Sequence, residues 1–414
     1  MNYLFDVIVV GGGPAGMIAA GRAAESGVKV LLLEKNRSLG RKLLITGKGR
    51  SNLTRAEFDP KELVKKYGRE GDFLLSPFSV FGVEKTVEFF NKRGLSTKIE
   101  RGKRIFPRSD SSRDVLFVLL KYLKEGKVAI RTGSEIKDVV KDGGKMARVV
   151  LKDGRELTAR NYIIATGGKS FPGTGSTGDG YLWLEKLGHK IEKLRPALVP
   201  LRIKENWVKS CHGLSLKNVK LTVFQDNKKK DSRFGEMLFT HFGVSGPIVL
   251  DLSFKTGELL EKGEVSLALD LKPALDFETL HKRVRSDFLK YGNKLYKNSL
   301  DDLLPQKMVP VVIELSGINP LKKVNEITKE ERMGLAKLLK GMKMQVSGLL
   351  GFDMAIITSG GVSLKEIDAK TMRSKLVENL FLAGEIINLH GPTGGYNLQL
   401  CWSTGYLAGK SSAA

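Results

Sequence analysis

Three glycines and one carboxylate near the N-terminus have the types and the spacing that bind a dinucleotide. Gly11, Gly13 and Gly16 form the pattern Gly-x-Gly-x-x-Gly, and Glu34 follows 23 residues after the first of them. The first glycine permits a tight turn, the second lets backbone approach a pyrophosphate, and the third lets a helix pack closely on a strand. A carboxylate at this distance accepts both ribose hydroxyls of an adenosine and disfavours a 2′-phosphate by charge repulsion.

The elements that must position these residues are those of a βαβ unit. The apolar run 7–10 is typical of a buried strand, an alanine-rich helix follows the glycines, and 28–33 is a second buried strand. The unpaired amides at the start of the helix are suited to receive phosphates. A lone glycine triplet is weak evidence. The segment 5–34 favours a nucleotide site over an ordinary βαβ unit, because it has a strand, the glycine triplet, a helix, a second strand and an acid in this order.

Segments elsewhere in the chain suit the rest of an extended cofactor. The loop 35–54 is basic and glycine-rich, and Ile136 lies where a returning strand can offer backbone to an adenine. Glu385 follows Gly384 at the end of a buried strand, where a carboxylate can bind the ribityl chain of a flavin. The turn 390–395 opens a helix whose amides can face a pyrophosphate or the carbonyl edge of a flavin. An ordinary β–loop–α ending is the alternative, but FAD fits both chain ends better than NAD does.

Two other patterns leave alternatives open. Gly173, Gly175 and Gly178 repeat the glycine spacing before a helix, but no strand leads directly into them, so a separate NAD(P) site is the less favoured interpretation. The segment 101–108 surrounds Phe106 with arginine and lysine. It is equally consistent with contact to a phosphate chain and a base, or with a charged surface hairpin.

Composition indicates a globular protein of two or three domains. The chain has 414 residues, 41% of them hydrophobic and 28% charged, and no apolar run approaches the length of a membrane span. The first strand begins almost at once, leaving no room for a signal peptide, and two cysteines do not make a disulfide framework. We therefore expect a cytoplasmic protein with no membrane association.

The positive charge is large and localised. The net charge is +24, of which residues 1–190 carry +15, 191–344 carry +9 and the last 70 none. Such a field concentrates polyanions such as RNA near the surface, although lysine-rich solubility is an equally good explanation.

The pattern of elements predicts an α/β fold with an insertion. A Rossmann-like FAD domain is expected from residues 1–190 and 345–414 together. Alternating strands predict an inserted β domain, sheet or barrel, over 191–275, and helical periodicity predicts a helical domain over 276–344.

The chain resembles the YhiN/BaiN-like flavoproteins, also called the aminoacetone-oxidase family, over essentially its whole length. The motifs that carry the resemblance include GRKLLITGKGRSNLT at 40–54, PGTGSTGDGY at 172–181, FTHFGVSGP at 239–247 and TGGYNLQ at 393–399. The resemblance implies a two-dinucleotide-binding-type FAD domain, an inserted β domain and a helical one. The positions that match, together with Ile136, give the expected cofactor-binding set: Gly11, Gly13, Pro14, Ala15, Gly16, Glu34, Lys35, Arg41, Lys42, Gly47, Gly49, Asn52, Ile136, Thr166, Gly167, Gly384, Glu385, Gly395, Asn397 and Leu398.

The resemblance also implies flavin-mediated hydride transfer, with NAD(P)H as the expected reductant. Family members oxidise small amines, reduce conjugated double bonds in steroid-like acids, or form dihydrouridine in ribosomal RNA. The basic charge favours ribosomal RNA as the partner. A small-molecule oxidase or ene-reductase, and an RNA-binding protein with structural FAD, are the alternatives.

Reduction of a conjugated double bond needs an acid to protonate carbon and an electrophile to polarise the carbonyl. His241 and His390 are the candidate histidines, and Arg104 is the candidate electrophile. Cys401 is a possible acid, but its apolar helix favours a small core residue. No metal-binding pattern is present in the sequence.

Overall fold

The structure, a computed structural model, describes residues 3–414. The chain forms two compact units. Unit 1 contains residues 1–196 and 355–414, and unit 2 contains residues 197–354. Each unit has its own hydrophobic core.

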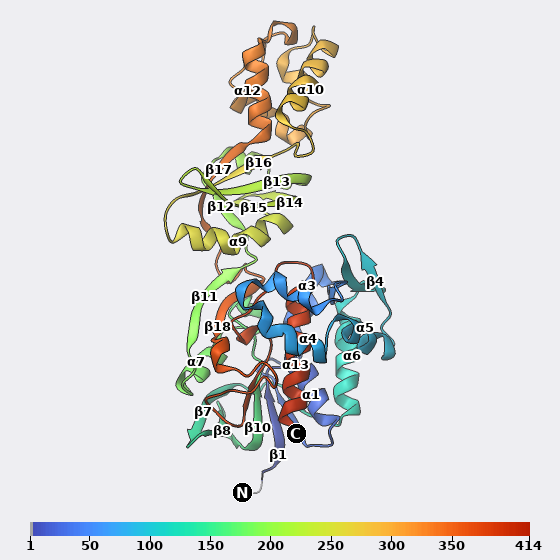
Figure 1. Cartoon of the computed structure of the whole chain (residues 1–414), viewed down its shortest axis with the longest axis vertical. Coiled ribbons are helices and arrows are strands. Elements are labelled where there is room, and N and C mark those ends of the chain that lie inside the picture. The colour runs from blue at the N-terminus through green and yellow to red at the C-terminus, as the bar shows by residue number, and fades with distance from the viewer. Residues whose placement is uncertain (1–2) are drawn as a thin grey trace. The chain divides into compact units, whose positions relative to one another are not determined.

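A parallel five-stranded sheet forms the centre of unit 1, in the strand order β19-β10-β1-β2-β6. Its strands are β1 (Phe5–Val10), β2 (Val30–Leu33), β6 (Ala129–Arg131), β10 (Ala159–Ile164) and β19 (Leu380–Leu382). Figure 1 labels two neighbouring strands of this sheet, β1 and β10. Four of the five strands contain a buried, continuous apolar run, at 7–10, 30–33, 162–164 and 380–382, as expected of a parallel sheet that is covered on both faces.

Helices from both ends of the chain pack against this sheet. Helix α1 (Pro14–Ala24) and helix α13 (Tyr396–Ser412) lie side by side, and glycines make this possible. An added Cβ at Gly405 would lie 2.4 Å from the carbonyl oxygen of Ala15, and one at Gly409 would lie 2.3 Å from that of Ala19. The matching spacing shows that the two helices run parallel. The N- and C-terminal segments therefore form one domain, as predicted.

The remaining helices of unit 1 connect or cover these strands. They are α2 (Arg41–Ile45), α3 (Pro60–Val64), α4 (Leu75–Val80), α5 (Val83–Lys92), α6 (Ser112–Glu125) and α7 (Asp179–Lys186). Three small sheets complete the described part of the unit. The first contains β3 (Thr54–Arg55), β5 (Arg104–Pro107) and β4 (Thr97–Glu100), and the second contains β7 (Ile136–Asp142), β8 (Lys145–Leu151) and β9 (Glu156–Leu157). The third pairs β11 (Ile191–Ala197) with β18 (Ile357–Val362).

A closed six-stranded barrel forms the first part of unit 2, in the order β12-β15-β14-β13-β16-β17. Its strands are β12 (Leu201–Ile203), β13 (Ser215–Gln225), β14 (Lys228–Thr240), β15 (Gly243–Ser245), β16 (Val265–Asp270) and β17 (Met342–Leu349). The short α8 (Trp207–Ser210) and the long α9 (Pro247–Leu260) pack with it. The helices α10 (Phe277–Lys290), α11 (Val309–Ser316) and α12 (Lys329–Lys340) make up the helical part.

The inserted barrel and helices confirm the predicted fold class, whereas the domain limits differ from those expected. The structure places the boundaries at 196/197 and 354/355 rather than at 190/191 and 344/345. Strand β11 pairs with β18 and so belongs to unit 1, while β17 closes the barrel between β16 and β12. The β part of the insertion is therefore not one continuous segment, because its last strand follows the helices. Among residues 3–414 no helix has the length and hydrophobicity needed to cross a membrane.

Candidate functional site

A pocket that is open to solvent lies where the strands of the parallel sheet end. Gly11 follows β1, Glu34 follows β2 and Thr166 closely follows β10, so the carboxyl ends of three strands contribute to it. Ligands of open α/β sheets bind at such strand ends. The further lining residues are Val10, Leu33, Lys35, Ser134, Ile136, Gly175, Thr177, Gly178, Asp179 and Trp183.

The first glycine motif has the geometry of a phosphate cradle. Gly11 has φ +107°, and an added Cβ there would lie 2.5 Å from the carbonyl oxygen of Ala165. A Cβ at Gly16 would lie 1.8 Å from the carbonyl oxygen of Gly11. Gly13, by contrast, has open space where a Cβ would be, and it precedes α1 without a side-chain cap. The first amides of α1 are therefore left for a ligand, and Pro14 sits where an N–H is not needed.

Glu34 is held in place by backbone amides. Its exposed fraction is 8%. Gly12 N donates to Oε2 over 2.8 Å, and Asn36 N donates to Oε1 over 2.8 Å. Asn36 Nδ2 also donates to Oε1 over 2.6 Å. These three bonds fix the orientation of the carboxylate and leave one of its roughly four acceptor sites for a ribose hydroxyl in the pocket.

Two glycines of the second triplet, Gly175 and Gly178, lie in the wall of this same pocket. Lys35 ties the segment to the first motif, because its Nζ donates to Asp179 Oδ2 over 2.7 Å and also to Thr177 Oγ1. The segment thus extends the predicted nucleotide pocket. The glycine spacing alone did not predict this shared pocket, because it suggests only a separate NAD(P) site as a less favoured interpretation.

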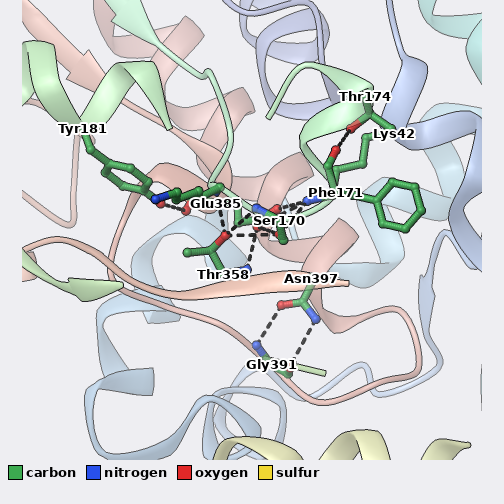
Figure 2. A network of polar contacts seen from close by, with 10 residues as sticks. Lys42, Ser170, Phe171, Thr174, Tyr181, Thr358, Glu385, Gly391 and Asn397 are labelled. Atoms are coloured by element: carbon green, nitrogen blue, oxygen red, sulfur yellow. Dashed lines mark hydrogen bonds and ion pairs between the residues drawn. The ribbon is translucent and has the colours of Figure 1, made fainter. Parts of the chain in front are cut away.

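A compact polar cluster surrounds the carboxylate of Glu385 (Figure 2). Lys42 Nζ lies 2.9 Å from Oε2, and Ser170 Oγ lies 2.9 Å from Oε1. Thr358 N also donates to Oε1 over 2.8 Å. These residues come from four segments separated by up to 343 positions. The cluster joins Lys42 and Glu385, two of the predicted cofactor residues, in a largely buried ion pair.

Two members of this cluster, Ser170 and Thr358, were not predicted. Thr358 Oγ1 accepts from Lys169 N over 2.7 Å and from Ser170 N over 3.0 Å, and so fastens the turn after β10 to β18. Tyr181 OH donates to the carbonyl oxygen of Glu385 over 3.3 Å, and burial raises the pKa of this phenol. The only sequence signal was the apolar strand ending in TSGGV, which does not show which segment its threonine meets.

The start of α13 is organised by two asparagines. Asn397 Oδ1 accepts from Gly391 N, and its Nδ2 donates to Gly391 O, both over 2.9 Å (Figure 2). In the amide orientation that satisfies both side-chain atoms, Asn52 accepts from Gly395 N over 3.1 Å and donates to Thr54 O over 2.9 Å. The side chain of Asn397 is therefore engaged within the loop, and the group it can offer to a ligand is its backbone amide.

Three more of the predicted cofactor-binding residues, Arg41, Gly47 and Gly49, lie in the segment that Asn52 anchors. A fourth, Gly167, lies in the turn after β10. Gly47 and Gly49 have φ +57° and +82°, which glycine adopts at little cost. Gly167 likewise has φ +75°. Arg41 donates to Asn36 Oδ1 over 2.8 Å, and Asn36 is one of the residues that orient Glu34.

The two helix N-termini are spaced for a ligand longer than a mononucleotide. Gly405 packs on Ala15, and Tyr396 begins α13 nine residues earlier. At 1.5 Å per residue the start of α13 lies about 13 Å beyond the start of α1 along the parallel helix axes. Gly384 also packs on Ala15, with an added Cβ 2.8 Å from that of Ala15. The cluster around Glu385 therefore lies next to the α1 N-terminus, on the side of unit 1 that both chain ends build.

Comparison with known proteins agrees with this geometry. The HI0933-like protein Rossmann domain matches residues 5–411. The chain belongs to the HI0933-like family. It is accordingly an enzyme of the FAD-dependent oxidoreductase class. The expected relationship to YhiN/BaiN-like flavoproteins is thereby confirmed.

Curated relatives of this HI0933-like chain cover its whole length. It is 33% identical to the 3-dehydro-bile acid delta(4,6)-reductase of Clostridium scindens, over 98% of each chain. It is 29% identical to the ribosomal RNA dihydrouridine synthase of Escherichia coli, over 99% of each chain. Among solved structures, the 3-ketosteroid-delta4-(5alpha)-dehydrogenase of Rhodococcus jostii superposes with a TM-score of 0.55 at 16% identity, covering 100% of this chain and 98% of the other, which shows a shared fold.

The residues of the HI0933-like chain fit FAD. Thr166 Oγ1 is buried in the pocket wall without a hydrogen-bond partner, as expected of a group that meets a ligand. Glu34 suits the ribose, the α1 amides suit the pyrophosphate, and the amides at the start of α13 suit a flavin carbonyl edge. Bound there, FAD would supply a hydride carrier.

The three candidate catalytic residues have different surroundings. Arg104 is exposed on β5, and His390 is half-buried in the loop before α13. His241 is exposed after β14 in unit 2, with its ring centroid 5.7 Å from that of His212. Their catalytic roles stay predictions. Cys401 packs near Gly384, and burial raises its pKa to about 12, which fits the core interpretation rather than an acid.

Proposed function

We propose that this HI0933-like enzyme reduces uridine to dihydrouridine in ribosomal RNA, with FAD as the carrier and NAD(P)H as the reductant. The observation that carries the proposal is full-length similarity to a ribosomal RNA dihydrouridine synthase in a chain with a net charge of +24. A second relative of that name, from Haemophilus influenzae, is 28% identical over 99% of each chain. Lysine and arginine in such excess favour a polyanionic substrate, because phosphate neutralisation releases counterions.

The reaction balances with the groups named. A hydride equivalent from NAD(P)H adds to one end of the uracil double bond conjugated to the carbonyl, and a proton adds to the other end. NAD(P)H becomes NAD(P)⁺, so no other oxidant or reductant is needed. The protein must orient the base, polarise the carbonyl and deliver the proton. Arg104 is proposed for polarisation, and His390 or His241 for proton delivery.

The test is mass spectrometry of nucleosides from the ribosomal RNA of a strain that lacks this gene. The proposal expects a loss of dihydrouridine that the wild-type gene restores and a Glu34→Ala variant does not. Unchanged dihydrouridine in the deletion strain would overturn it.

A steroid-like acid is the second candidate substrate, because the relative from Clostridium scindens has the higher identity, 33%. Arg104 would again polarise the carbonyl and His390 or His241 would again deliver the proton, since the double bond is likewise conjugated to a carbonyl. Rapid turnover of a 3-dehydro-bile acid, insensitive to salt and without RNA binding, would favour this candidate over RNA.

A further inference from the structure

We propose that one face of the β13–β14 hairpin binds single-stranded RNA; the proposal rests on ribosomal RNA being the substrate. The hairpin turns through Asp226 and Asn227, with φ +51° and +57°, the conformation of a tight two-residue turn. Along β13 the buried residues Val219, Leu221 and Val223 alternate with the others. Residues 220, 222 and 224 therefore point away from the barrel core.

Cross-strand pairs place lysine beside aromatic rings on this outer face. Lys220 pairs with Phe234, Thr222 pairs with Ser232, and Phe224 pairs with Lys229. Residues that pair directly lie on the same side of a sheet. We call these six residues, Lys220, Thr222, Phe224, Lys229, Ser232 and Phe234, the hairpin face.

The hairpin face is open to solvent at both of its ends. Phe234 is 63% exposed, and Lys229 is exposed. Helix α9 packs on the opposite side, since an added Cβ at Gly235 would lie 2.8 Å from Ile248 and Gly235 pairs with the buried Val219. The barrel core therefore does not account for the exposed aromatic ring.

The charge of the hairpin is unbalanced. It carries Lys217, Lys220, Lys228, Lys229 and Lys230, and none of them forms an ion pair with any residue that the structure describes. Asp231 is paired internally with Arg233 over 2.6 Å, which leaves Asp226 and Glu236 as the other acids of the hairpin. Free lysines repel one another, and a phosphate backbone would remove that repulsion.

Aromatic rings beside unpaired cations form the surface that single strands use. Bases stack on exposed rings while lysines neutralise the neighbouring phosphates, and the hydroxyls of Thr222 and Ser232 between the rings can bond to base edges or sugars. A duplex keeps its bases stacked inside and offers nothing to Phe234. The proposal thus commits to unpaired RNA rather than to a duplex or an anionic membrane.

The experiment uses the full-length FAD-loaded protein and a labelled single-stranded RNA of about twelve nucleotides. Phe234→Ala should weaken binding roughly tenfold without changing the salt dependence. Lys220→Gln with Lys229→Gln should lower the slope of log affinity against log salt by about 1.4, or 0.7 for each phosphate contact. Leu289→Ala with Lys282→Gln and Lys337→Gln, all exposed on α10 and α12, is the matched control and should have little effect.

The outcomes separate this proposal from the proposed function. If the variants bind RNA and form dihydrouridine as the wild type does, the hairpin face is overturned while the function stands. If the variants lose RNA binding but the deletion strain keeps its dihydrouridine, the function fails while the RNA surface stands. Equal binding of a duplex of the same sequence, or of anionic vesicles, would also overturn the proposal. Unchanged flavin absorbance and thermal unfolding in the variants would show that folding is intact.

Discussion

Each unit carries a basic hairpin, β4–β5 in unit 1 and β13–β14 in unit 2, and the two differ in how a phenylalanine ring is placed. In unit 1 the ring of Phe106 on β5 is buried, and the guanidinium of Arg50 lies 4.2 Å from its centroid. Arg50 pairs with Asp110, and Lys98 pairs with Asp110 over 2.7 Å. In unit 2 the ring of Phe234 is exposed and its neighbouring lysines are unpaired. Basic composition is therefore common to the two hairpins, and the exposure of the aromatic ring is what distinguishes them.

The same contrast applies to the units as wholes. Unit 1 has glycines that tolerate no side chain, a largely buried ion pair and a pocket at the strand ends. Unit 2 has a closed barrel with an exposed charged face. By the two proposals above, the cofactor accordingly belongs to unit 1 and the substrate strand to unit 2.

The largest effect is expected for Gly16→Ala in unit 1. Its Cβ would lie 1.8 Å from the carbonyl oxygen of Gly11, so the cradle must shift, at a cost of roughly 1–3 kcal/mol. The purified variant should lack flavin absorbance and unfold at a lower temperature. Gly334→Ala on α12, where a Cβ meets nothing within 4 Å, is the control and should keep its flavin. A flavin-replete Gly16→Ala protein would contradict the cradle.

A smaller effect on the same cofactor is expected for Glu34→Gln. It keeps the shape of the side chain but replaces a charge-assisted bond to a ribose, worth about 1.5–3 kcal/mol, with a weaker neutral one. FAD affinity, measured by calorimetry on the apoprotein, should fall roughly tenfold or more, while RNA affinity stays unchanged. If both affinities fell together, the division between the units would be wrong.

The buried His189 should make unit 1 sensitive to acid. Its Nδ1 lies 3.0 Å from Glu366 Oε2 and its Nε2 lies 3.0 Å from Ser374 Oγ. Burial lowers the pKa of the imidazole, against the opposing effect of Glu366. The unfolded chain, with a pKa near 6.5, then binds a proton that the folded chain does not. Stability should be full above about pH 6.5 and decrease as the pH falls below it.

Thermal unfolding of FAD-loaded protein between about pH 5 and 8 measures this dependence. His189→Gln should flatten the curve, and His212→Gln, an exposed histidine of unit 2, should leave it as in the wild type. A curve equally steep in His189→Gln would assign the acid sensitivity to other groups.

The smallest effect on RNA affinity is expected for substitutions in and beside the β4–β5 hairpin of unit 1. Arg101→Gln with Arg108→Gln, two exposed arginines near Phe106, should change RNA affinity by less than about threefold, because the ring of Phe106 is buried and cannot stack on a base. The measurement is the same RNA titration used for the hairpin face. A loss as large as that of the β13–β14 variants would show that both hairpins bind RNA.

Patterns in the sequence predicted those parts of the fold whose residues are close together along the chain. The βαβ unit from Phe5 to Glu34 is contiguous, so glycine spacing and apolar runs were sufficient to predict it. Barrel closure by β17 was missed because the pairing of Ile203 with Val346 spans the whole insertion. The contacts of Glu385 with Ser170 and Thr358 were missed for the same reason, since no periodicity encodes a meeting of distant turns. The side-chain role of Asn397 was likewise decided by a loop contact with Gly391.

The most direct test of the account is an anaerobic single turnover. The FAD-loaded protein is bleached with NADPH or NADH, separated from excess nucleotide, and mixed with ribosomal RNA from the deletion strain. The account predicts that flavin absorbance returns as about one dihydrouridine forms for each flavin, and that the Phe234→Ala variant needs more RNA for the same rate. Flavin that stays bleached in the presence of this RNA, but is reoxidised by a 3-dehydro-bile acid, would contradict it.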